Sequence, residues 1–276
     1  MKSQSAAGTL IGRIAKGFAM GVSMLVPGVS GGTMAVVLGA YDEIIAALGS
    51  FRRDVGANCV LLLPYLAGGA AGAALLSGPM LAVLEAWTKP VLFFFVGAIA
   101  AGIPPMYRKV RVSRLKPLNA AAGAAGAIAA VATGYLPAGL FTPESGPGPV
   151  AALLLLLAGL ITAVALILPG ISGSYVLLML GMYDMTLAAF SEADFAYLLP
   201  LAAGVLLGVF STASFLERQM RRRPQFTYML IIGFVAGSAI QVFPGIPSGA
   251  EAPACLAALL CGFGLVYLAG RLGSGR

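Results

Sequence analysis

Hydrophobic segments run the length of the chain, separated by short stretches that hold glycine, proline and most of the charged residues. A helix that crosses the hydrocarbon core of a bilayer takes about 20 apolar residues. The pattern therefore predicts membrane helices throughout, in an all-α integral membrane protein. The predicted segments lie at residues 14–26, 33–48, 58–84, 90–106, 118–137, 150–168, 174–190, 197–216, 226–243 and 252–270.

Two breaks in this pattern share a sequence. Residues 27–42 read PGVSGGTMAVVLGAYD and residues 169–184 read PGISGSYVLLMLGMYD, with eight of sixteen positions identical. After a gap of six residues the match continues, with Pro64, Gly68, Gly72 and Gly97 falling on Pro200, Gly204, Gly208 and Gly233. Internal repeats of this kind are common in transporters. We expect a first repeat at 1–137 with its tip at 27–32, a linker at 138–149, and a second repeat at 150–276 with its tip at 169–174.

Composition agrees with a membrane protein. The chain is 59% hydrophobic and 10% charged, with a mean hydropathy of +0.95, whereas a soluble domain carries about 25% charged residues. The three cysteines fit neither a disulfide framework nor a zinc site. The chain contains no histidine, which removes the commonest general base and metal ligand. We expect no catalytic residue, no metal and no cofactor.

The positive charges indicate a topology. Sixteen of the seventeen Lys and Arg residues lie in five clusters, at 2–16, 52–53, 108–116, 218–223 and 271–276. The intervening loops carry the acids Glu85, Glu144, Glu192, Asp194 and Glu251, with Lys89 as the remaining cation. Under the positive-inside rule, the five clusters and both termini are cytoplasmic. Because the net charge of +7 is explained in this way, nucleic acid is not an expected partner.

With this topology, the first pair of broken segments starts and ends inside and the matching pair starts and ends outside, so the repeats are inverted. Each arm of the first pair has about ten residues and reaches roughly 16 Å, about half of a bilayer core. We therefore expect two re-entrant helical hairpins that enter from opposite faces, each followed by three transmembrane helices. The alternative is ten spanning segments, since residues 150–168 are long enough to cross.

The two hairpin tips are the predicted anion site. Irregular backbone at membrane depth is tolerated where it lines a polar cavity, and paired breaks in inverted halves mark transporter binding sites. A serine at each tip can cap the outgoing arm, whose N-terminal N–H groups attract an anion. The alternative is that these small residues only allow close packing. The predicted phosphate-binding residues are Ser30, Gly31, Gly32, Thr33, Ser172, Gly173, Ser174 and Tyr175.

Two further groups are candidates. The Tyr-Asp pairs at Tyr41-Asp42 and Tyr183-Asp184 recur in both halves and could carry a coupling proton or sodium ion, or gate the hairpin mouths; alternatively, they anchor the ends of the arms at the interface. Arg52 and Arg53 could attract anionic headgroups, or could serve only as part of the topology signal.

At residues 21–42 and 165–184 the chain resembles a bacterial family of PopT-type polyprenyl-phosphate translocases, formerly a domain of unknown function (number 368). The resemblance extends through FFFVGAIAAGIP (93–104) and IIGFVAGSAIQVFPG (231–245). One departure is Met24, where several relatives carry an acid, and this departure weakens the case for ion coupling in this chain.

The resemblance implies a flippase of the bacterial plasma membrane that returns undecaprenyl phosphate from the outer to the cytoplasmic leaflet, so that this carrier lipid is recycled. Its partners would be undecaprenyl phosphate and bilayer lipid, and the oligomeric state is left open. Two alternatives stay open at this point. The same hairpins could serve a transporter of a small soluble anion, and an enzyme such as a lipid-pyrophosphate phosphatase is less compatible with a chain that lacks histidine.

Overall fold

The computed structural model describes residues 6–110, 116–135, 148–249 and 251–274, and these residues form eleven α-helices and no strand. Most of the linker predicted at 138–149 lies outside the described residues, as do Lys2, Arg111, Arg114, Glu144 and Arg276. Within these described ranges, five helices are long and apolar enough to cross a membrane, or up to seven if each of two bent helix pairs counts as one span. The chain is a multi-pass membrane protein whose described secondary structure is helical.

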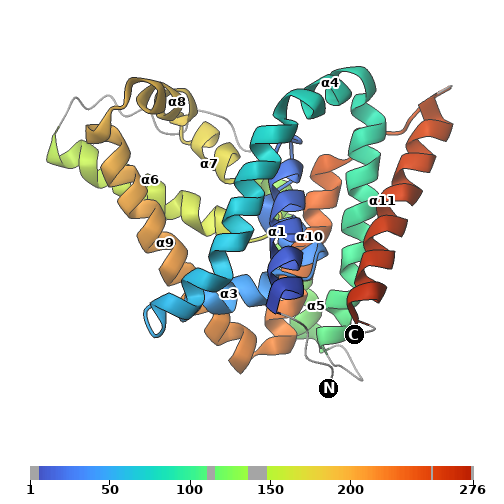
Figure 1. Ribbon diagram of the computed structural model, residues 1–276, viewed down its shortest axis with the longest axis horizontal. Helices are drawn as coiled ribbons and strands as arrows, with labels where there is room; N and C mark the ends of the chain where they lie inside the picture. The colour runs from blue at the N-terminus through green and yellow to red at the C-terminus, as the bar shows by residue number, and fades with distance from the viewer. Residues whose placement is uncertain (1–5, 111–115, 136–147, 250, 275–276) are drawn as a thin grey trace.

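The first half begins with α1 (Ala6–Ser23), followed after the first tip by two short helices, α2 (Gly31–Val37) and α3 (Tyr41–Gly49). Helix α4 (Val55–Val110) would be about 84 Å long if straight, but Trp87 has non-helical angles (φ −139°, ψ 44°) and bends it. Figure 1 shows the two arms of α4 rising to this bend and returning. They correspond to the predicted segments 58–84 and 90–106. Helix α5 (Pro117–Thr133) completes the half.

The second half has the same order of elements. Helix α6 (Pro149–Ile167) leads to the second tip, and the short helices α7 (Gly173–Met179) and α8 (Tyr183–Glu192) follow it. Then come α9 (Phe195–Arg222), α10 (Pro224–Val242) and α11 (Glu251–Ser274). Helices α6 to α9 lie together at the left of Figure 1, whereas α10 lies near the centre, against α5 and the second arm of α4.

The outgoing arms predicted at 33–48 and 174–190 are wrong as single segments. Helices α2 and α3 meet at 118°, and α7 and α8 meet at 108°. Both breaks contain a glycine with positive φ, Gly39 at +66° and Gly181 at +69°, a conformation that glycine adopts without steric cost. The Tyr-Asp pairs therefore do not end an arm: they begin the helices α3 and α8.

Glycines bring the long helices into close contact. A Cβ added at Gly68 on α4 would lie 2.2 Å from the carbonyl oxygen of Ile14 on α1, and one added at Gly204 on α9 would lie 2.0 Å from that of Leu156 on α6. Such approaches are typical of small residues between membrane helices. The shifts between equivalent residues are 136 and 142, as in the sequence alignment. The same contact therefore occurs in both halves.

The last helix of each half packs against a helix of the other half. Helix α11 packs on the second arm of α4, and α5 packs on α10. A Cβ added at Gly97 would lie 2.1 Å from the carbonyl oxygen of Leu259, and one at Gly233 would lie 2.0 Å from that of Gly123. The two contacts are equivalent, because Gly97 and Gly233 are 136 positions apart and so are Gly123 and Leu259. This packing ties the two halves together.

The two hairpins have different surroundings. Helices α2 and α3 contribute Met34, Val36 and Ile45 to the main hydrophobic core, where they pack among residues of α4 and α10. Helices α7 and α8 contact α6 and α9 and form only a small cluster around Leu155 and Met182. Equivalent sequences are thus deeply buried in the first half and peripheral in the second.

Candidate functional site

The first tip is a tight turn between α1 and α2. Gly28 has φ +82°, and the exposed residues Pro27 and Gly28 lie between the buried residues Val26 and Val29. Ser30 is the N-cap of α2, and its Oγ accepts a hydrogen bond from the Thr33 N–H at 3.1 Å. Capping by Ser30, which the sequence predicted, is confirmed.

The second tip has the same turn but a different cap. Gly170 has φ +85°, close to the value of Gly28. Ser172 occupies the N-cap position of α7, but its side chain makes no capping hydrogen bond. Its Oγ instead lies 2.9 Å from Ser174 Oγ. Capping by Ser172 is therefore wrong, because the neighbouring hydroxyl is its partner in place of the backbone.

The two tips meet. The backbone N–H of Gly170 donates to Thr33 Oγ1 at 2.8 Å and to Ser30 Oγ at 3.2 Å. The Tyr41 hydroxyl donates to the carbonyl oxygen of Ile167 at 2.8 Å. The polar groups of the first tip are thus occupied by the backbone of the second, which holds the two hairpins together at the centre of the molecule.

The candidate residues of the first tip are closed off. Ser30 is 7% exposed and Thr33 is fully buried. Gly31 and Gly32 are half-buried; a Cβ at Gly31 would lie 2.9 Å from Met24 Sδ, and one at Gly32 would lie 3.3 Å from Pro169 Cα. Ser30 and Thr33 are therefore closed to a ligand in the conformation observed, whereas Pro27 and Gly28 of the same tip are exposed.

The second tip is open. A cavity of ≈ 660 Å³ lies beside it, lined by Ser172, Ser174, Tyr175 and Tyr183 from the second hairpin. The ends of α5 and α10 and the first tip, with Pro27 and Gly28, complete the lining. Of the second tip's candidates, Gly173 is buried and does not line the cavity. Among the described residues, the lining of this cavity includes hydroxyl groups and no cation, as the sequence suggested for an anion site.

Sequence reasoning missed polar residues on the opposite wall of this cavity. Gln241 on α10 lines the cavity and donates through Nε2 to Thr133 Oγ1 on α5 at 3.0 Å, and also to the carbonyl oxygen of Ala130. A polar side chain within an apolar membrane segment is a functional candidate. Gln241 breaks the run IIGFVAGSAIQVF, so the signal was present in the sequence.

One buried hydroxyl lies beside the second tip. Thr162 on α6 is 5% exposed, and its Oγ1 has no hydrogen-bond partner among the described residues. A Cβ added at Gly173 would lie 3.5 Å from Thr162 Cγ2. Burying a polar group without a hydrogen-bond partner costs free energy. The Thr162 hydroxyl is therefore available to form a hydrogen bond near the second tip.

Two acids fix the first hairpin to its surroundings. Asp42 Oδ2 accepts from Lys109 Nζ on the second arm of α4 at 2.7 Å and from the Tyr228 hydroxyl on α10 at 3.0 Å. The other oxygen, Oδ1, is buried without a partner in the part of the chain that the structure describes. Sequence reasoning proposed Asp42 for coupling, but neither of its partners is within the repeat motif.

The neighbouring acid makes a second network. Glu43 accepts from Arg13 on α1, with Arg13 Nε at 3.0 Å, and from the Tyr65 hydroxyl on α4 at 2.9 Å. Together Asp42 and Glu43 connect α3 to α1, α10 and both arms of α4. We call the network of these six side chains the α3 lock: Asp42, Glu43, Arg13, Tyr65, Lys109 and Tyr228.

The second hairpin has no such lock. Asp184 is exposed, and its side chain makes no ion pair or hydrogen bond within the described ranges. The positions equivalent to Lys109 and Tyr228 hold Gly245 and Leu92, and the one equivalent to Glu43 holds Met185. Tyr183 is 36% exposed and lines the cavity, whereas its counterpart Tyr41 is 3% exposed. The lock is therefore specific to the first half.

Arg52 and Arg53 lie apart from the tips, in the turn between α3 and α4. Both are exposed, and both line a second, smaller cavity of ≈ 330 Å³ against α6 and α9. Among the residues described, no group of three or more Cys, Asp or Glu side chains could hold a metal ion.

Comparison with known proteins identifies the family. A family profile described as VCA0040-like, undecaprenyl phosphate translocase-like, matches residues 20–251. A protein of Staphylococcus aureus (strain NCTC 8325 / PS 47) named "Polyprenyl-phosphate transporter" is 33% identical over 248 residues, which cover 85% of this chain and 87% of that protein. A protein of Vibrio cholerae serotype O1 (strain ATCC 39315 / El Tor Inaba N16961) with the same name is 32% identical over 249 residues, 83% of this chain and 76% of that protein. No solved structure matches the chain. From the residues matched and the identity over most of its length, the chain belongs to the undecaprenyl phosphate translocase-like family.

Proposed function

We propose that this protein transports polyprenyl phosphate across the plasma membrane, moving undecaprenyl phosphate from the outer to the cytoplasmic leaflet for reuse. The observation that carries the proposal is the cavity of ≈ 660 Å³ at the second tip. The names of the relatives from two bacteria support the choice of substrate. Neither a soluble anion nor a pyrophosphate substrate has comparable support.

The cavity suits the two parts of such a lipid. Ser172, Ser174, Tyr175 and Tyr183 offer hydroxyl donors to a phosphate at the N-terminal turn of α7, where the helix dipole favours an anion. Leu178, Ile240, Phe243 and Val131 provide an apolar wall for the first isoprene units. Neutral donors bind a phosphate less tightly than buried cations would, so the lipid can be released on the other side.

We infer that the two halves are an inverted repeat that exchanges conformations. Their equivalent glycine contacts support a common architecture. Val36 is 3% exposed while its counterpart Leu178 is 40% exposed and lines the cavity. In the exchanged state, Ser30, Gly31, Gly32 and Thr33 would line a cavity open to the cytoplasm, and the second tip would be closed. Alternating exposure of this kind is common in transporters with inverted repeats.

The α3 lock is the proposed cytoplasmic gate. It holds α3 against three other helices in the state in which the second tip is open. Asp42 is the better coupling candidate of the two aspartates, because protonation would remove the charge that binds Lys109 and Tyr228. We propose that a proton or sodium ion acts there. We also propose that both termini are cytoplasmic.

Flipping of lipid in proteoliposomes tests the function. Purified protein is reconstituted with labelled undecaprenyl phosphate, and the label accessible from outside is followed with time. We expect faster loss of accessible label than in empty liposomes, and slower loss with Ser172→Ala and Ser174→Ala together. Equal rates with and without protein would refute the proposal.

Two parallel assays separate the alternatives. Uptake of a labelled soluble anion such as inorganic phosphate should not exceed that of empty liposomes. Release of phosphate from undecaprenyl pyrophosphate should stay at background. Activity in either assay without lipid flipping would assign the protein to the corresponding class.

A further inference from the structure

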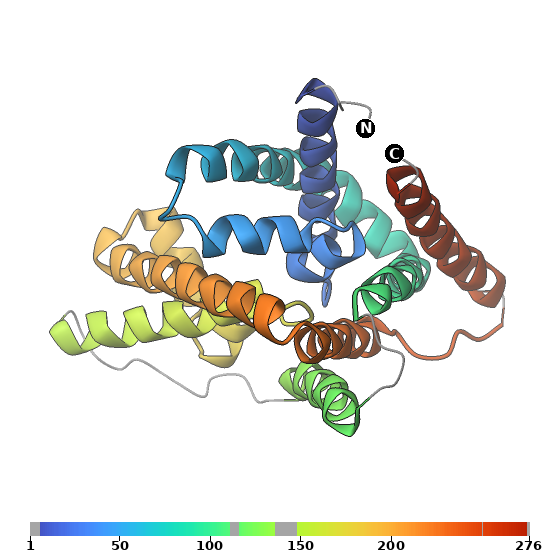
Figure 2. The ribbon, with the colours of Figure 1, turned by 90° about the horizontal axis from the view of Figure 1, so that it is seen from below.

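The second cavity lies at the turn that joins α3 to α4, against α9 and α6. The turn contributes Ser50, Arg52 and Arg53 to the lining, and α9 contributes Ser211. Figure 2 shows α3 running beside α9, so this cavity lies between elements of the two halves. Its volume of ≈ 330 Å³ is enough for a phosphate group and the first atoms of a lipid tail.

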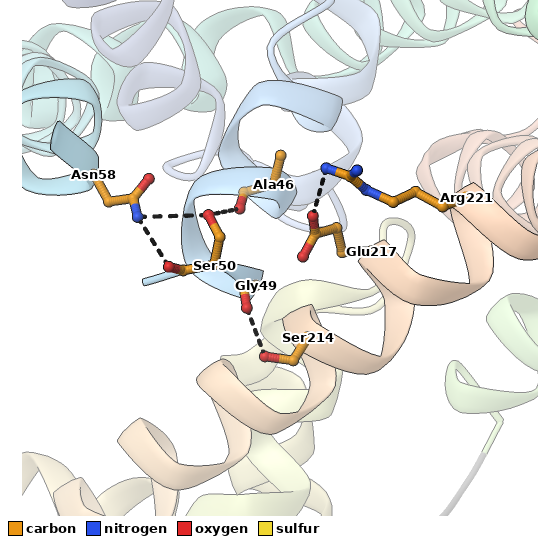
Figure 3. Close-up of polar contacts among 7 residues, drawn as sticks. All are labelled: Ala46, Gly49, Ser50, Asn58, Ser214, Glu217 and Arg221. Atoms are coloured by element: carbon orange, nitrogen blue, oxygen red, sulfur yellow. Dashed lines mark hydrogen bonds and ion pairs between the residues drawn. The ribbon is translucent and has the colours of Figure 1, made fainter. Parts of the chain in front are cut away.

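Hydrogen bonds fix the turn that carries the arginines. Asn58 Nδ2 donates to the Ser50 carbonyl oxygen at 3.2 Å, and Ser214 Oγ donates to the Gly49 carbonyl oxygen at 3.0 Å. The Ser50 hydroxyl in turn donates to the carbonyl oxygen of Ala46 at 2.7 Å. Figure 3 shows these contacts closing the C-terminal end of α3. The start of the turn is therefore held in one position, which lowers the entropic cost of binding a ligand.

The nearby acids are already engaged. Glu217 pairs with Arg221 at 2.9 Å, as Figure 3 also shows. Asp54 Oδ1 accepts from the Ala57 N–H at the start of α4 at 3.0 Å. Within the described parts of the chain, neither Arg52 nor Arg53 forms an ion pair. Two exposed guanidinium groups are therefore available to an anion.

The wall that α6 and α9 contribute is largely apolar. Leu160 on α6 and Leu207 on α9 are 37% and 49% exposed and line the cavity. The rings of Phe51 and Phe210 pack with their centroids 4.9 Å apart and form a further part of the wall. A site with guanidinium groups at one edge and exposed leucines at the other fits an amphiphile with an anionic head.

The connection that carries the arginines is longer than its counterpart. Five residues, 50–54, join α3 to α4, whereas two, Ala193 and Asp194, join α8 to α9. The second half makes the same connection without arginines, and Asp194 there serves as the cap of α9. The additional turn is thus not needed to link a hairpin to the next helix.

We propose that this cavity is a second lipid-phosphate site, which holds polyprenyl phosphate in the cytoplasmic leaflet when it leaves or approaches the central tips. The inference rests on the proposed function. A phosphate monoester carries a charge of about −1.5 to −2 at pH 7, which two guanidinium groups match with bidentate hydrogen bonds. The phosphodiester of bulk phosphatidylglycerol carries a single charge, so the site prefers the monoester.

Native mass spectrometry of the full chain tests this site by counting bound lipids. The probe is undecaprenyl phosphate, added to protein in detergent. We expect two bound lipids per chain for the unsubstituted protein and one for Arg52→Gln with Arg53→Gln, with an affinity about tenfold lower at the lost site. The matched control is Arg222→Gln with Arg223→Gln, which removes two exposed arginines that do not line the cavity. It should still bind two.

The outcomes separate the two proposals. Two lipids on the Arg52 and Arg53 variant would overturn the second site and leave the proposed function standing. Failure of the unsubstituted protein to bind any undecaprenyl phosphate would overturn both. Phosphatidylglycerol at an equal concentration should not displace the undecaprenyl phosphate that depends on Arg52 and Arg53. If it does, the inference is overturned, because the cavity would then bind bulk lipid equally well. A retained single lipid on the variant reports that it is folded.

Discussion

The substitution Asp42→Asn should open the first tip toward the cytoplasm. It keeps the size of the side chain but removes its negative charge. In the unsubstituted protein, Asp42 Oδ2 accepts hydrogen bonds from Lys109 Nζ at 2.7 Å and from the Tyr228 hydroxyl at 3.0 Å. The Lys109 and Asp42 side chains are 38% and 35% exposed, and a pair at such a position contributes up to about 1 kcal/mol. Loss of the charge-assisted part of the Tyr228 hydrogen bond removes about 1 kcal/mol more.

A loss of about 2 kcal/mol shifts an equilibrium roughly 30-fold. If the first tip exists in a closed and an open state, the ratio of open to closed molecules should rise by this factor of roughly 30. Val36→Cys reports it, because Val36 is 3% exposed and its counterpart Leu178 lines the open cavity.

The assay measures the rate at which a membrane-impermeant maleimide labels Val36→Cys from the cytoplasmic face of inverted vesicles. The three native cysteines are first replaced by alanine: Cys59, Cys255 and Cys261. We expect Asp42→Asn to raise the labelling rate about 30-fold. Asp184→Asn is the matched control, since Asp184 is exposed, and it should leave the rate unchanged. Equal rates for the two variants would refute the gate.

Two further predictions concern unfolding in detergent. Tyr41→Phe removes a buried hydrogen bond between the hairpins and should lower the free energy of unfolding by about 0.6–1.7 kcal/mol, whereas Tyr183→Phe, at the cavity wall, should not change it. Gly170→Ala should lower it by more than about 2 kcal/mol, because φ is +85° and the added Cβ would lie 2.3 Å from the Phe234 carbonyl oxygen. Gly264→Ala, with nothing within 4 Å of the added Cβ, is the control. Equal midpoints for either pair would contradict the corresponding contact.

The tips could be predicted from the sequence because their conformations are local. Glycines in a repeated motif indicated turns, and Gly28 and Gly170 adopt nearly the same positive φ. The glycine contacts also follow the alignment, since close helix approach requires a small residue at a fixed place. The breaks before Tyr41 and Tyr183 could also have been predicted, because a glycine recurs at 39 and 181. Glycine adopts a positive φ without steric cost, so the residue type alone indicates a possible break.

The difference between the halves could not be predicted. Ser30 and Ser172 occupy equivalent positions in nearly identical motifs, yet Ser30 is buried against Gly170 and Ser172 lines a cavity. The cause lies outside the motif, in side chains such as Lys109 that are distant in sequence and have no equivalent in the other half. A repeat alignment compares residues with their counterparts and carries no information on such partners.

The most direct test of the proposed transport site is the position of the phosphate in an experimental structure with bound undecaprenyl phosphate. We expect the phosphate in the cavity beside the second tip, within hydrogen-bond distance of Ser172, Ser174 or Tyr183, with the tail along Leu178 and Phe243. A phosphate bound away from both tips, with this cavity empty, would contradict it.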